Sequence, residues 1–440
     1  MMQICYKDTT KYRIWLFIRL FFTLIFSILP ESGALGGVVV FSHGESIRGF
    51  FEAKTPQISS KKGIFAETNK QMNGARILII YTGGTIGMLE NPTTGALEAF
   101  DWEHISNFVP ELARFHYDIE TITFGPPIDS SDMEPKYWTR MVEVIADNYD
   151  NYEGFVLLHG TDTMAFTASA LSFMLENLSK PVIITGSQLP IGQLRTDGKE
   201  NLLTSIEIAA ARYPDGSPVV PEVCIFFENK LLRGNRTTKI NSEGFNAFRS
   251  YNFHNLADAG IHIKFEEAFI HRPDPEKPFR PNYLLDDHVA ILTLFPGMRE
   301  EVMNAYLTIP NLRGLVLKTY GAGNAPKLPW LYERLKELSN RGVVIVNTTQ
   351  CSTGAVDMGR YDTSLQLIEA GVLNGHDMTL ECVVTKLMFL LGHNYERSRI
   401  CELMNTSLAG EVTLPCGDSS TESGCFLRSH LAPVHRLCAD

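Results

Sequence analysis

From residue 76 onward, short runs of apolar and β-branched residues alternate with segments of helical periodicity. Four such runs, ILIIYT, GFVLLH, PVIITG and VCIFFE, lie at residues 77–82, 154–159, 181–186 and 223–228. The segment between the second and third runs is rich in strong helix formers, with apolar residues at helical spacing. Unbroken apolar strands separated by helices predict a parallel sheet that is covered on both faces. The chain is therefore predicted to be an α/β protein.

A loop rich in proline and charge, HRPDPEKPFRPNYLLD at residues 271–286, interrupts this alternation. After the loop, the runs VAILTLFPG, GLVLKTYG and GVVIVNTTQ restart the pattern. A chain of 440 residues is longer than one hydrophobic core usually serves. We predict two domains, a larger one at residues 72–286 with a mostly parallel sheet and a smaller α/β domain at residues 287–414.

Both ends of the chain depart from the pattern. Residues 1–71 are predicted to be an N-terminal extension, and residues 415–440 an unstructured tail that is dispensable for activity and solubility. The apolar run at residues 15–30 is interrupted by Arg19 and is too short to span a bilayer comfortably, so no stable membrane association is expected. It is typical of a signal peptide, and the alternative is that translation starts at Met72.

N-glycosylation sequons help to choose a compartment. Among them, Asn235 lies in a candidate active-site segment and Asn347 ends a strand that the pattern predicts to be buried. A glycan at Asn235 would obstruct the candidate active site, and a glycan at Asn347 would conflict with the predicted burial of the strand. The sequence therefore favours a cytoplasmic protein, with export as the alternative if residues 1–37 act as a signal peptide.

Charge and cysteine content exclude some classes of function. The formal net charge of −11 argues against binding of a nucleic-acid backbone. The eight cysteines include no C-x-x-C pair and are not accompanied by paired histidines, so no zinc site is predicted. We expect mostly buried, reduced cysteines in the main body of the chain.

The first predicted strand ends in the hexapeptide TGGTIG. Its paired glycines permit a tight turn and close backbone approach by a ligand, and Thr85 offers a hydroxyl beside backbone amides. These are the parts of a nucleophile with an oxyanion hole. The segment has neither the dinucleotide-binding spacing G-x-G-x-x-G nor the Gly-Lys-Ser/Thr of a phosphate loop. Taken alone, the hexapeptide fits equally a glycine turn in which Thr85 caps the next segment.

Ligands of open parallel sheets bind at the carboxyl ends of the strands, where a second polar motif lies, and a third precedes the helix predicted to open at residues 134–135. HGTDTM ends the second strand, and its Thr161 and Asp162 can cap a helix or present a hydroxyl and a charge to a ligand. His159 in the same motif is predicted to be a packed core residue. DSSDM, with Ser130, Ser131 and Asp132, has the donors and acceptors that hold the ammonium and carboxylate of an amino acid. These residues can equally be capping residues.

A fourth motif, RGNRTTK, follows the strand at residues 223–228 and ends in Lys239. A lysine beside a threonine hydroxyl can accept its proton where desolvation lowers the pKa of the ammonium group. Lysines in isolation are more often solvated surface charges.

In combination, TGGTIG, DSSDM, HGTDTM, GSQLP and RGNRTTK resemble, in this order, the bacterial-type L-asparaginase family, and its type I, cytoplasmic branch in particular. The resemblance extends from about residue 76 to 414 and includes TYGAGNAP and NTTQCSTGAVDMG in the second domain. It implies a two-domain α/β fold and a homotetramer arranged as a dimer of dimers.

The resemblance also implies residue roles. Thr85 matches the nucleophilic threonine of the family, and Thr161, Asp162 and Lys239 match its second threonine and the aspartate–lysine pair. The residues expected to bind the α-carboxylate and α-amino ends of the substrate are Ser130, Ser131, Asp132, Thr161 and Asp162. The implied reaction is hydrolysis of L-asparagine to L-aspartate and ammonia through an ester on Thr85. Oxyanion donors contribute about 3 to 4 kcal/mol each to such a reaction, and no metal or cofactor is required.

Two features depart from the family pattern. The lid segment at residues 88–97 has no tyrosine, although the family often has one there that orients the nucleophile. A second, activating asparagine site in some type I enzymes uses an arginine and a cysteine. Here Cys351 is present, but Lys318 replaces the arginine and cannot bind a carboxylate in bidentate fashion.

Three alternatives remain open at this stage. Another amidase on the same scaffold could act on glutamine or D-asparagine, since one methylene discriminates by only about 1 to 3 kcal/mol. An amidotransferase subunit acting on misacylated tRNA is disfavoured by the net charge. A non-catalytic amino-acid sensor is disfavoured because all four candidate catalytic residues are present.

Overall fold

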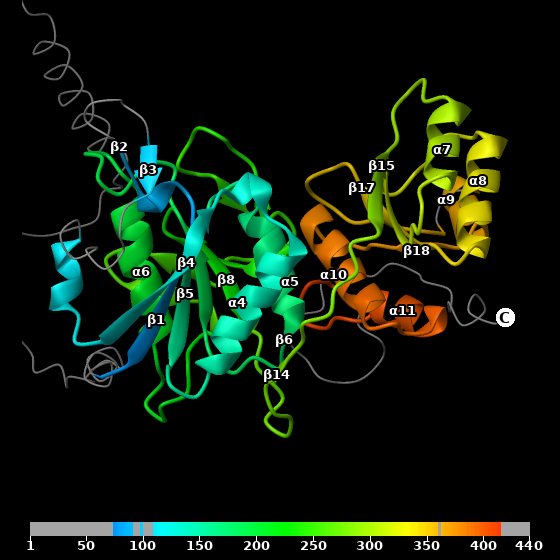
Figure 1. Cartoon of the computed structure of the whole chain (residues 1–440). Coiled ribbons are helices and arrows are strands. Elements are labelled where there is room, and N and C mark those ends of the chain that lie inside the picture. The colour runs from blue at the N-terminus through cyan, green and yellow to red at the C-terminus, as the bar shows by residue number, and fades with distance from the viewer. Residues whose placement is uncertain (1–73, 91–96, 100–108, 360–361, 415–440) are drawn as a thin grey trace, which may run out of the picture. The chain divides into compact units, whose positions relative to one another are not determined.

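The computed structural model describes residues 74–90, 97–99, 109–359 and 362–414, and these form two α/β domains that are joined by one of their apolar clusters (Figure 1). The predictions for residues 1–71 and for the tail at 415–440 lie outside the described residues. Among the residues described, no helix is both long and apolar enough to cross a membrane.

The N-terminal domain is built on an eight-stranded sheet in the described part of the chain. Its parallel strands, in spatial order, are β4 (Asp118–Ile128), β1 (Arg76–Gly83), β5 (Gly154–Leu158), β7 (Val182–Thr185) and β8 (Val223–Phe227). The antiparallel strands β9 (Lys230–Arg233), β12 (Ala257–Ala259) and β13 (Ile263–Phe265) complete the sheet beside β8. The predicted α/β class with a mostly parallel sheet is confirmed, and β1, β5, β7 and β8 are the four predicted runs.

Alternate residues of the central strands enter two different cores, because successive side chains of a strand point to opposite faces. Leu78 and Ile80 pack with helices α4 (Pro135–Asp147) and α5 (Met164–Met174). Ile77 and Ile79 pack with helix α6 (Gly198–Ala210) on the other face. Figure 1 shows α6 on one side of the sheet and α4 with α5 on the other. Burial on both faces explains why these strands are apolar throughout.

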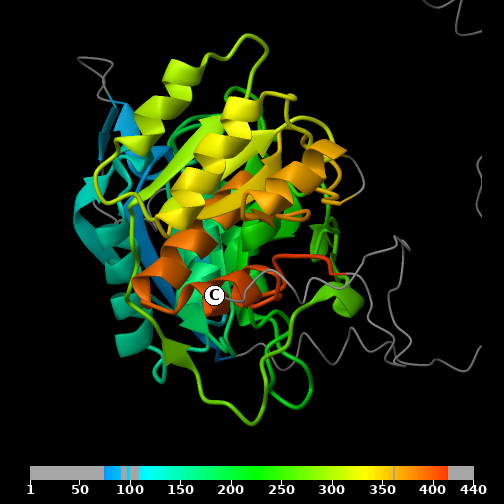
Figure 2. The same cartoon turned by 90° about the vertical axis from the view of Figure 1, so that its right-hand side faces the viewer.

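The smaller domain has a parallel sheet of β15 (Val289–Thr293), β16 (Gly314–Thr319), β17 (Val344–Thr349) and β18 (Val372–Asn374). One face carries α7 (Glu300–Leu307), α8 (Pro329–Asn340) and α9 (Asp362–Glu369). The other face carries α10 (Leu380–Gly392) and α11 (Arg397–Met404). Figure 1 shows α8 and α10 on opposite sides of this sheet, and Figure 2 shows the yellow helix α8 in front of it. Apolar residues of α10 belong to the same core as α5, so the two domains are joined by packing as well as by the chain.

Short elements connect these layers. The described parts of the lid form a hairpin of β2 (Met88–Glu90) and β3 (Leu97–Ala99). In the predicted interdomain loop, β14 (Arg280–Pro281) pairs with β6 (Leu175–Glu176). The remaining pair, β10 (Thr238–Lys239) and β11 (Phe248–Arg249), places Lys239 on a small antiparallel ribbon.

Candidate active site

The TGGTIG turn brings three strand ends into direct backbone contact. Gly83 and Gly84 have φ angles of 140° and 91°, which favour glycine. A Cβ on Gly83 would lie 2.1 Å from the Ile128 carbonyl oxygen at the end of β4, and a Cβ on Gly84 would lie 2.5 Å from the Gly160 Cα after β5. The two glycines are therefore required for this packing.

Thr85 and Thr161 each follow one of two glycines that touch. Gly84 packs on Gly160, and the next residue on each side is a threonine. Thr85 begins a 3₁₀ turn, η1 (Thr85–Gly87), and is partly exposed. Within the part of the chain that the structure describes, no hydrogen bond holds the Thr85 hydroxyl. The side chain is thus available to a ligand at the carboxyl edge of the sheet, where α/β proteins bind their ligands.

The DSSDM motif forms a 3₁₀ turn, η4 (Ser130–Asp132), on the same edge. The Asp129 carboxylate accepts from the Ser131 N–H at 2.9 Å and from its hydroxyl at 2.8 Å, and these bonds lower the pKa of Asp129. Ser130 is buried, and its Oγ accepts from the Asp162 N–H at 3.3 Å. The Ser131 and Asp132 residues are exposed. The motif thus contacts HGTDTM directly, as a shared site requires.

Lys239 connects the remaining predicted residues. Its Nζ donates to Thr161 Oγ1 at 2.8 Å and to Asp162 Oδ1 at 2.7 Å. The Lys239 side chain is 17% exposed and that of Asp162 is 63% exposed. An ion pair this open to water contributes little to stability, so the arrangement is better explained by chemistry than by folding.

Gln188, from the GSQLP segment after β7, completes this cluster and was given no role by the sequence. The Thr161 hydroxyl donates to Gln188 Oε1 at 3.3 Å, and Gln188 Nε2 donates to the Gly244 carbonyl at 3.0 Å. Asp197 fixes the Gln188 backbone by accepting from its N–H at 3.0 Å. Because an ammonium can only donate, Thr161 accepts from Lys239 and directs its own proton to Gln188. The position of Gln188 at the end of a parallel strand was the signal that could have identified it.

His159 lies in the core, as its sequence position predicts. It is 1% exposed, with Nδ1 at 2.6 Å from the Gly160 carbonyl and Nε2 at 2.9 Å from Thr167 Oγ1. The Thr167 hydroxyl also accepts from Trp138 Nε1 at 2.9 Å. Burial lowers the pKa of His159 to about 4 despite the bond to Gly160. The imidazole is neutral near pH 7 and supports the backbone before Thr161.

This burial predicts an acid-sensitive fold. The pKa of His159 falls from 6.5 in the unfolded chain to about 4 in the folded one, so the unfolded state binds the extra proton between these values. The contribution of His159 to the free energy of unfolding is fully present above pH 6.5. It is lost as the pH falls toward 4, which lowers the free energy of unfolding by about 3 kcal/mol. Urea unfolding at several pH values should show a smaller loss for His159→Gln than for wild type. Equal losses would contradict this assignment.

The predicted regulatory residues lie in the smaller domain. Lys318 is on β16 opposite Thr348, and its carbonyl accepts from Gln350 Nε2 at 3.0 Å. Cys351, one residue after Gln350, is exposed and forms no disulfide with another described cysteine. Both therefore lie at the carboxyl end of the second sheet. Gly354, in the same loop, exchanges hydrogen bonds of 2.9 Å with Asn252 of the larger domain.

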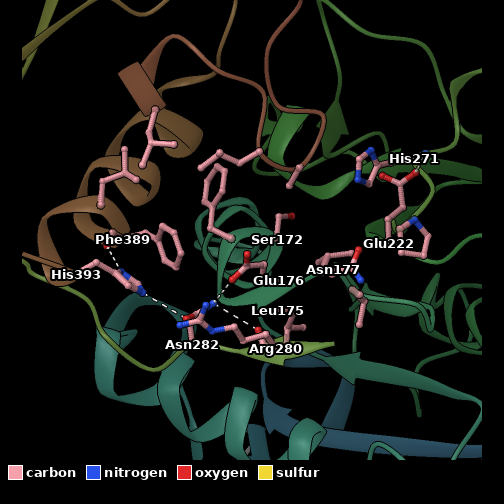
Figure 3. A pocket seen from close by; sticks show the side chains of 18 of the residues that line it. Ser172, Leu175, Glu176, Asn177, Glu222, His271, Arg280, Asn282, Phe389 and His393 are labelled. Carbon is pink, nitrogen blue, oxygen red and sulfur yellow. Dashed lines mark hydrogen bonds between the residues drawn. The ribbon is translucent and has the colours of Figure 1, made fainter. Parts of the chain in front are cut away.

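A cavity of about 250 Å³ lies apart from these residues, at the amino end of β8 and between α5, α10 and α11 (Figure 3). Its polar groups bind one another: Asn282 donates to Glu176 Oε2 at 3.2 Å and its Oδ1 lies 3.4 Å from His393 Nε2. None of the predicted site residues lines it. Within the described ranges, Asp286, Asp287 and His288 are grouped closely enough to bind a metal, but Asp286 already pairs with Arg313. Neither feature competes with the cluster around Lys239.

Comparison with known proteins covers both domains. Residues 76–271 match the family model "Asparaginase, N-terminal", and residues 288–404 match "Glutaminase/Asparaginase C-terminal domain". The chain is 43% identical to L-asparaginase 1 of Escherichia coli K12 over 78% of this chain and 99% of that protein. It is 40% identical to the human 60 kDa lysophospholipase over 77% of this chain and 62% of that protein. The crystal structure of L-asparaginase I from Vibrio cholerae is similar, with a TM-score of 0.71 and 43% identity over 77% of this chain and 99% of that one.

Proposed function

The chain belongs to the asparaginase family, and from that membership and the geometry of the site we infer that it is an L-asparaginase. The enzyme hydrolyses the side-chain amide of asparagine and releases aspartate and ammonia. The observation that carries this inference is the contact of Lys239 with both Thr161 and Asp162, next to the Thr85 turn. A non-catalytic sensor would have no need of this set.

We propose that Thr85 is the nucleophile. Its oxygen attacks the side-chain carbonyl of asparagine, and the C–N bond breaks as ammonia leaves with a proton that originated on the threonine hydroxyl. Water then cleaves the aspartyl ester and restores the hydroxyl. The lack of a fixed hydrogen-bond partner for Thr85 in the described residues supports this role, because the hydroxyl is free to turn toward a substrate.

Thr161, Asp162 and Lys239 are proposed to transfer the protons in both steps. The contacts of Lys239 with Thr161 and Asp162 support this role, since a proton can move between the lysine nitrogen and the threonine hydroxyl along a hydrogen bond that is already formed. Backbone amides near Thr85 and Thr161 would bind the oxyanion. No step requires a metal or a cofactor.

The free ends of the substrate are assigned to the DSSDM motif. The exposed carboxylate of Asp132 suits the α-ammonium, together with Asp162, and the hydroxyls of Ser130 and Ser131 suit the α-carboxylate. Their proximity to Thr161 and Asp162 supports the assignment, because Ser130 bonds the Asp162 N–H.

The assembly and compartment are part of the same proposal. A homotetramer built as a dimer of dimers is supported by Ile291 and Phe295, which are 39% and 51% exposed on or beside the edge strand β15. An exposed edge strand that carries apolar residues is prone to pair with another chain. A cytoplasmic location is proposed from the sequons at buried positions. Light scattering on protein eluted from a size-exclusion column would test the tetramer, and cell fractionation would test the cytoplasmic location.

Ammonia release from asparagine and from glutamine tests the function. The purified full-length chain is expected to release ammonia from asparagine, with a rate that saturates as the asparagine concentration rises. Its kcat/KM for glutamine is expected to be much lower. A higher kcat/KM for glutamine would identify a glutaminase, and no release from either by folded protein would contradict the enzyme. A sigmoidal dependence on asparagine would support a second site at Lys318 and Cys351, whereas a hyperbolic one would contradict it.

A further inference from the structure

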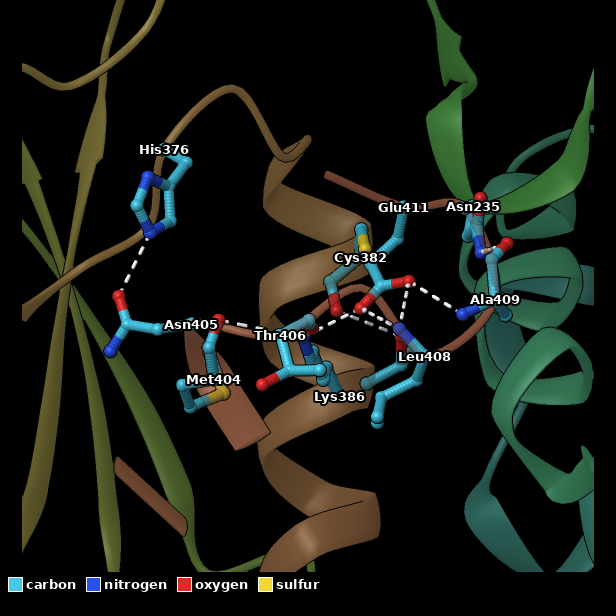
Figure 4. Close-up of polar contacts among 12 residues, drawn as sticks. Asn235, His376, Cys382, Lys386, Met404, Asn405, Thr406, Leu408, Ala409 and Glu411 are labelled. Carbon is cyan, nitrogen blue, oxygen red and sulfur yellow. Dashed lines mark hydrogen bonds and ion pairs between the residues drawn. The ribbon is translucent and has the colours of Figure 1, made fainter. Parts of the chain in front are cut away.

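A stretch of backbone after α11, residues 408–413, binds the segment that carries Lys239. We call this stretch the strap (Figure 4). Asn235 Nδ2 donates to the Ala409 carbonyl at 2.9 Å, and both Arg233 Nη1 and Arg236 Nε donate to the Gly410 carbonyl, at 3.1 and 2.9 Å. These three donors are at most 5% exposed. Segment 233–239 is therefore bound by carbonyls that lie some 170 residues away in the sequence, through contacts that exclude water.

The strap itself is fixed by a fully buried ion pair. The Lys386 Nζ on α10 lies 2.6 Å from Glu411 Oε1, and both side chains are 0% exposed. The Glu411 carboxylate accepts from the N–H groups of Leu408 and Ala409 at 3.0 and 2.8 Å, which closes the strap into a turn. Lys386 also donates to the Thr406 carbonyl at 2.7 Å. Removing one member of such a pair leaves an uncompensated buried charge, so the turn depends on Glu411.

The pKa of Glu411 agrees with this geometry. Burial alone would raise it, but the Lys386 ammonium and the N–H groups of Ala409 and Leu408 outweigh burial and hold the pKa below its usual value. Glu411 is therefore an anion that accepts hydrogen bonds from the strap.

A second contact joins the strap to the catalytic segment. Asp377 accepts from Arg236 Nη1 at 2.8 Å and from the Thr413 N–H at 2.9 Å. Thr238, the neighbour of Lys239, donates to Glu381 Oε1 on α10 at 2.6 Å. Segment 233–239 thus rests on α10 and the strap up to the residue before Lys239.

Gly410 is required where the strap meets Arg233. Its φ is +76°, and a Cβ there would lie 2.5 Å from Arg233 Nη1. Any side chain at this position would displace either the strap or the guanidinium.

We propose that Glu411 is a positioning residue for Lys239. By fixing the strap, Glu411 sets the backbone of segment 233–239 and so places Lys239 Nζ between Thr161 and Asp162. The expected effect on catalysis rests on the proposed function. The structural link from Glu411 through the strap to segment 233–239 does not depend on that function. Ser130 and Asp132 lie on η4, which has no hydrogen bond to the strap among the described residues, so the effect falls mainly on kcat and reaches KM only through the contact of Lys239 with Asp162.

Glu411→Gln tests this link, since glutamine keeps the size and one acceptor oxygen but leaves Lys386 unpaired. In full-length protein that remains folded by circular dichroism, we expect a kcat about 10- to 100-fold lower, as for a displacement of about 1 Å. KM for asparagine should change less than about threefold, and the pH profile of kcat should shift. If the variant only contained less folded protein, kcat would fall by the same factor at every pH, and the pH at which kcat changes would stay the same.

Asp286→Asn is the matched control. Asp286 also pairs with an arginine, Arg313, and accepts from one backbone N–H, that of His288, but does not contact the strap or segment 233–239. This variant should lower thermal stability with an unshifted pH profile. Replacing Lys386 by methionine in the Glu411→Gln variant removes the unpaired charge and should restore most of kcat.

Hydrogen–deuterium exchange separates this proposal from the proposed function. In Glu411→Gln, the backbone amides of segment 233–239 should exchange faster than in wild type, and those of residues 129–133 should exchange at the wild-type rate. In Asp286→Asn, the exchange rates of both segments should equal those of wild type. If Glu411→Gln does not fold, Gly410→Ala is measured in the same way, because its Cβ crowds Arg233. Unchanged exchange and kcat, or changes equal to those of Asp286→Asn, would overturn the proposal. If wild-type protein releases no ammonia, the proposed function is contradicted. The exchange rates alone then decide whether Glu411 fixes segment 233–239.

Discussion

Replacing Thr85 with alanine is expected to lower kcat for asparagine at least about 10⁴-fold, as is typical when an enzyme loses its nucleophile. The remaining site would still bind asparagine, so KM should change little. The fold should be preserved, because no hydrogen bond in the described residues depends on the Thr85 hydroxyl. A substitution of this kind changes stability by about 0.5 kcal/mol or less.

The measurement compares ammonia release by Thr85→Ala with release by Thr85→Ser and Thr82→Val. Serine keeps a hydroxyl and should retain measurable turnover. Thr82 lies three residues earlier, and its buried hydroxyl donates to the Leu158 carbonyl at 2.9 Å. Its valine variant should therefore lose about 1 kcal/mol of stability and little kcat. Turnover that persists in Thr85→Ala would move the nucleophile to Thr161.

How far the fold could be predicted depended on where each strand lies. β1, β5, β7 and β8 are buried on both faces and so appear in the sequence as unbroken apolar runs. β4 has the sequence DIETITFGPPI and lies at the edge of the sheet with most of its residues exposed or partly exposed. Solvent on an edge strand removes the need for apolar residues, and the pattern that identified the other strands is absent there. Strands of two or three residues, such as β12, are too short to produce any pattern.

The candidate site was predictable to the extent that its residues follow strands. Thr85 and Thr161 come after β1 and β5, which the sequence predicts, whereas Ser130 follows β4, which it does not; the glycine contacts bring the three backbones together. Lys239 was chosen by motif, and only the structure places its ammonium on Thr161. The dependence of that placement on Glu411 could not be predicted, because a buried ion pair between α10 and the strap has no local sequence pattern. The residues of the lid at 91–96 lie outside the described part of the chain, so the substitute for the family tyrosine stays open.

The second large effect is expected for Lys239→Met, which should lower kcat about 10³-fold, within the usual range for loss of a proton-transfer group. Methionine keeps most of the length and the apolar stem of lysine but cannot donate to Thr161 or Asp162. Asp162 would remain well solvated, since it is 63% exposed. Stability should therefore change by less than about 1 kcal/mol, and the loss of kcat would reflect chemistry.

Lys230→Met is the matched control, because Lys230 is exposed on β9 just before segment 233–239. It should leave kcat and KM unchanged. Thr161→Val and the double variant Thr161→Val with Lys239→Met complete a cycle. If Thr161 and Lys239 act as one unit, the double variant should be about as slow as the slower single variant. Multiplied losses would mean that the two residues act independently, and a loss below tenfold in Lys239→Met would limit the lysine to holding Asp162. A loss below tenfold in Lys239→Met would also remove the reason for a strap that positions Lys239.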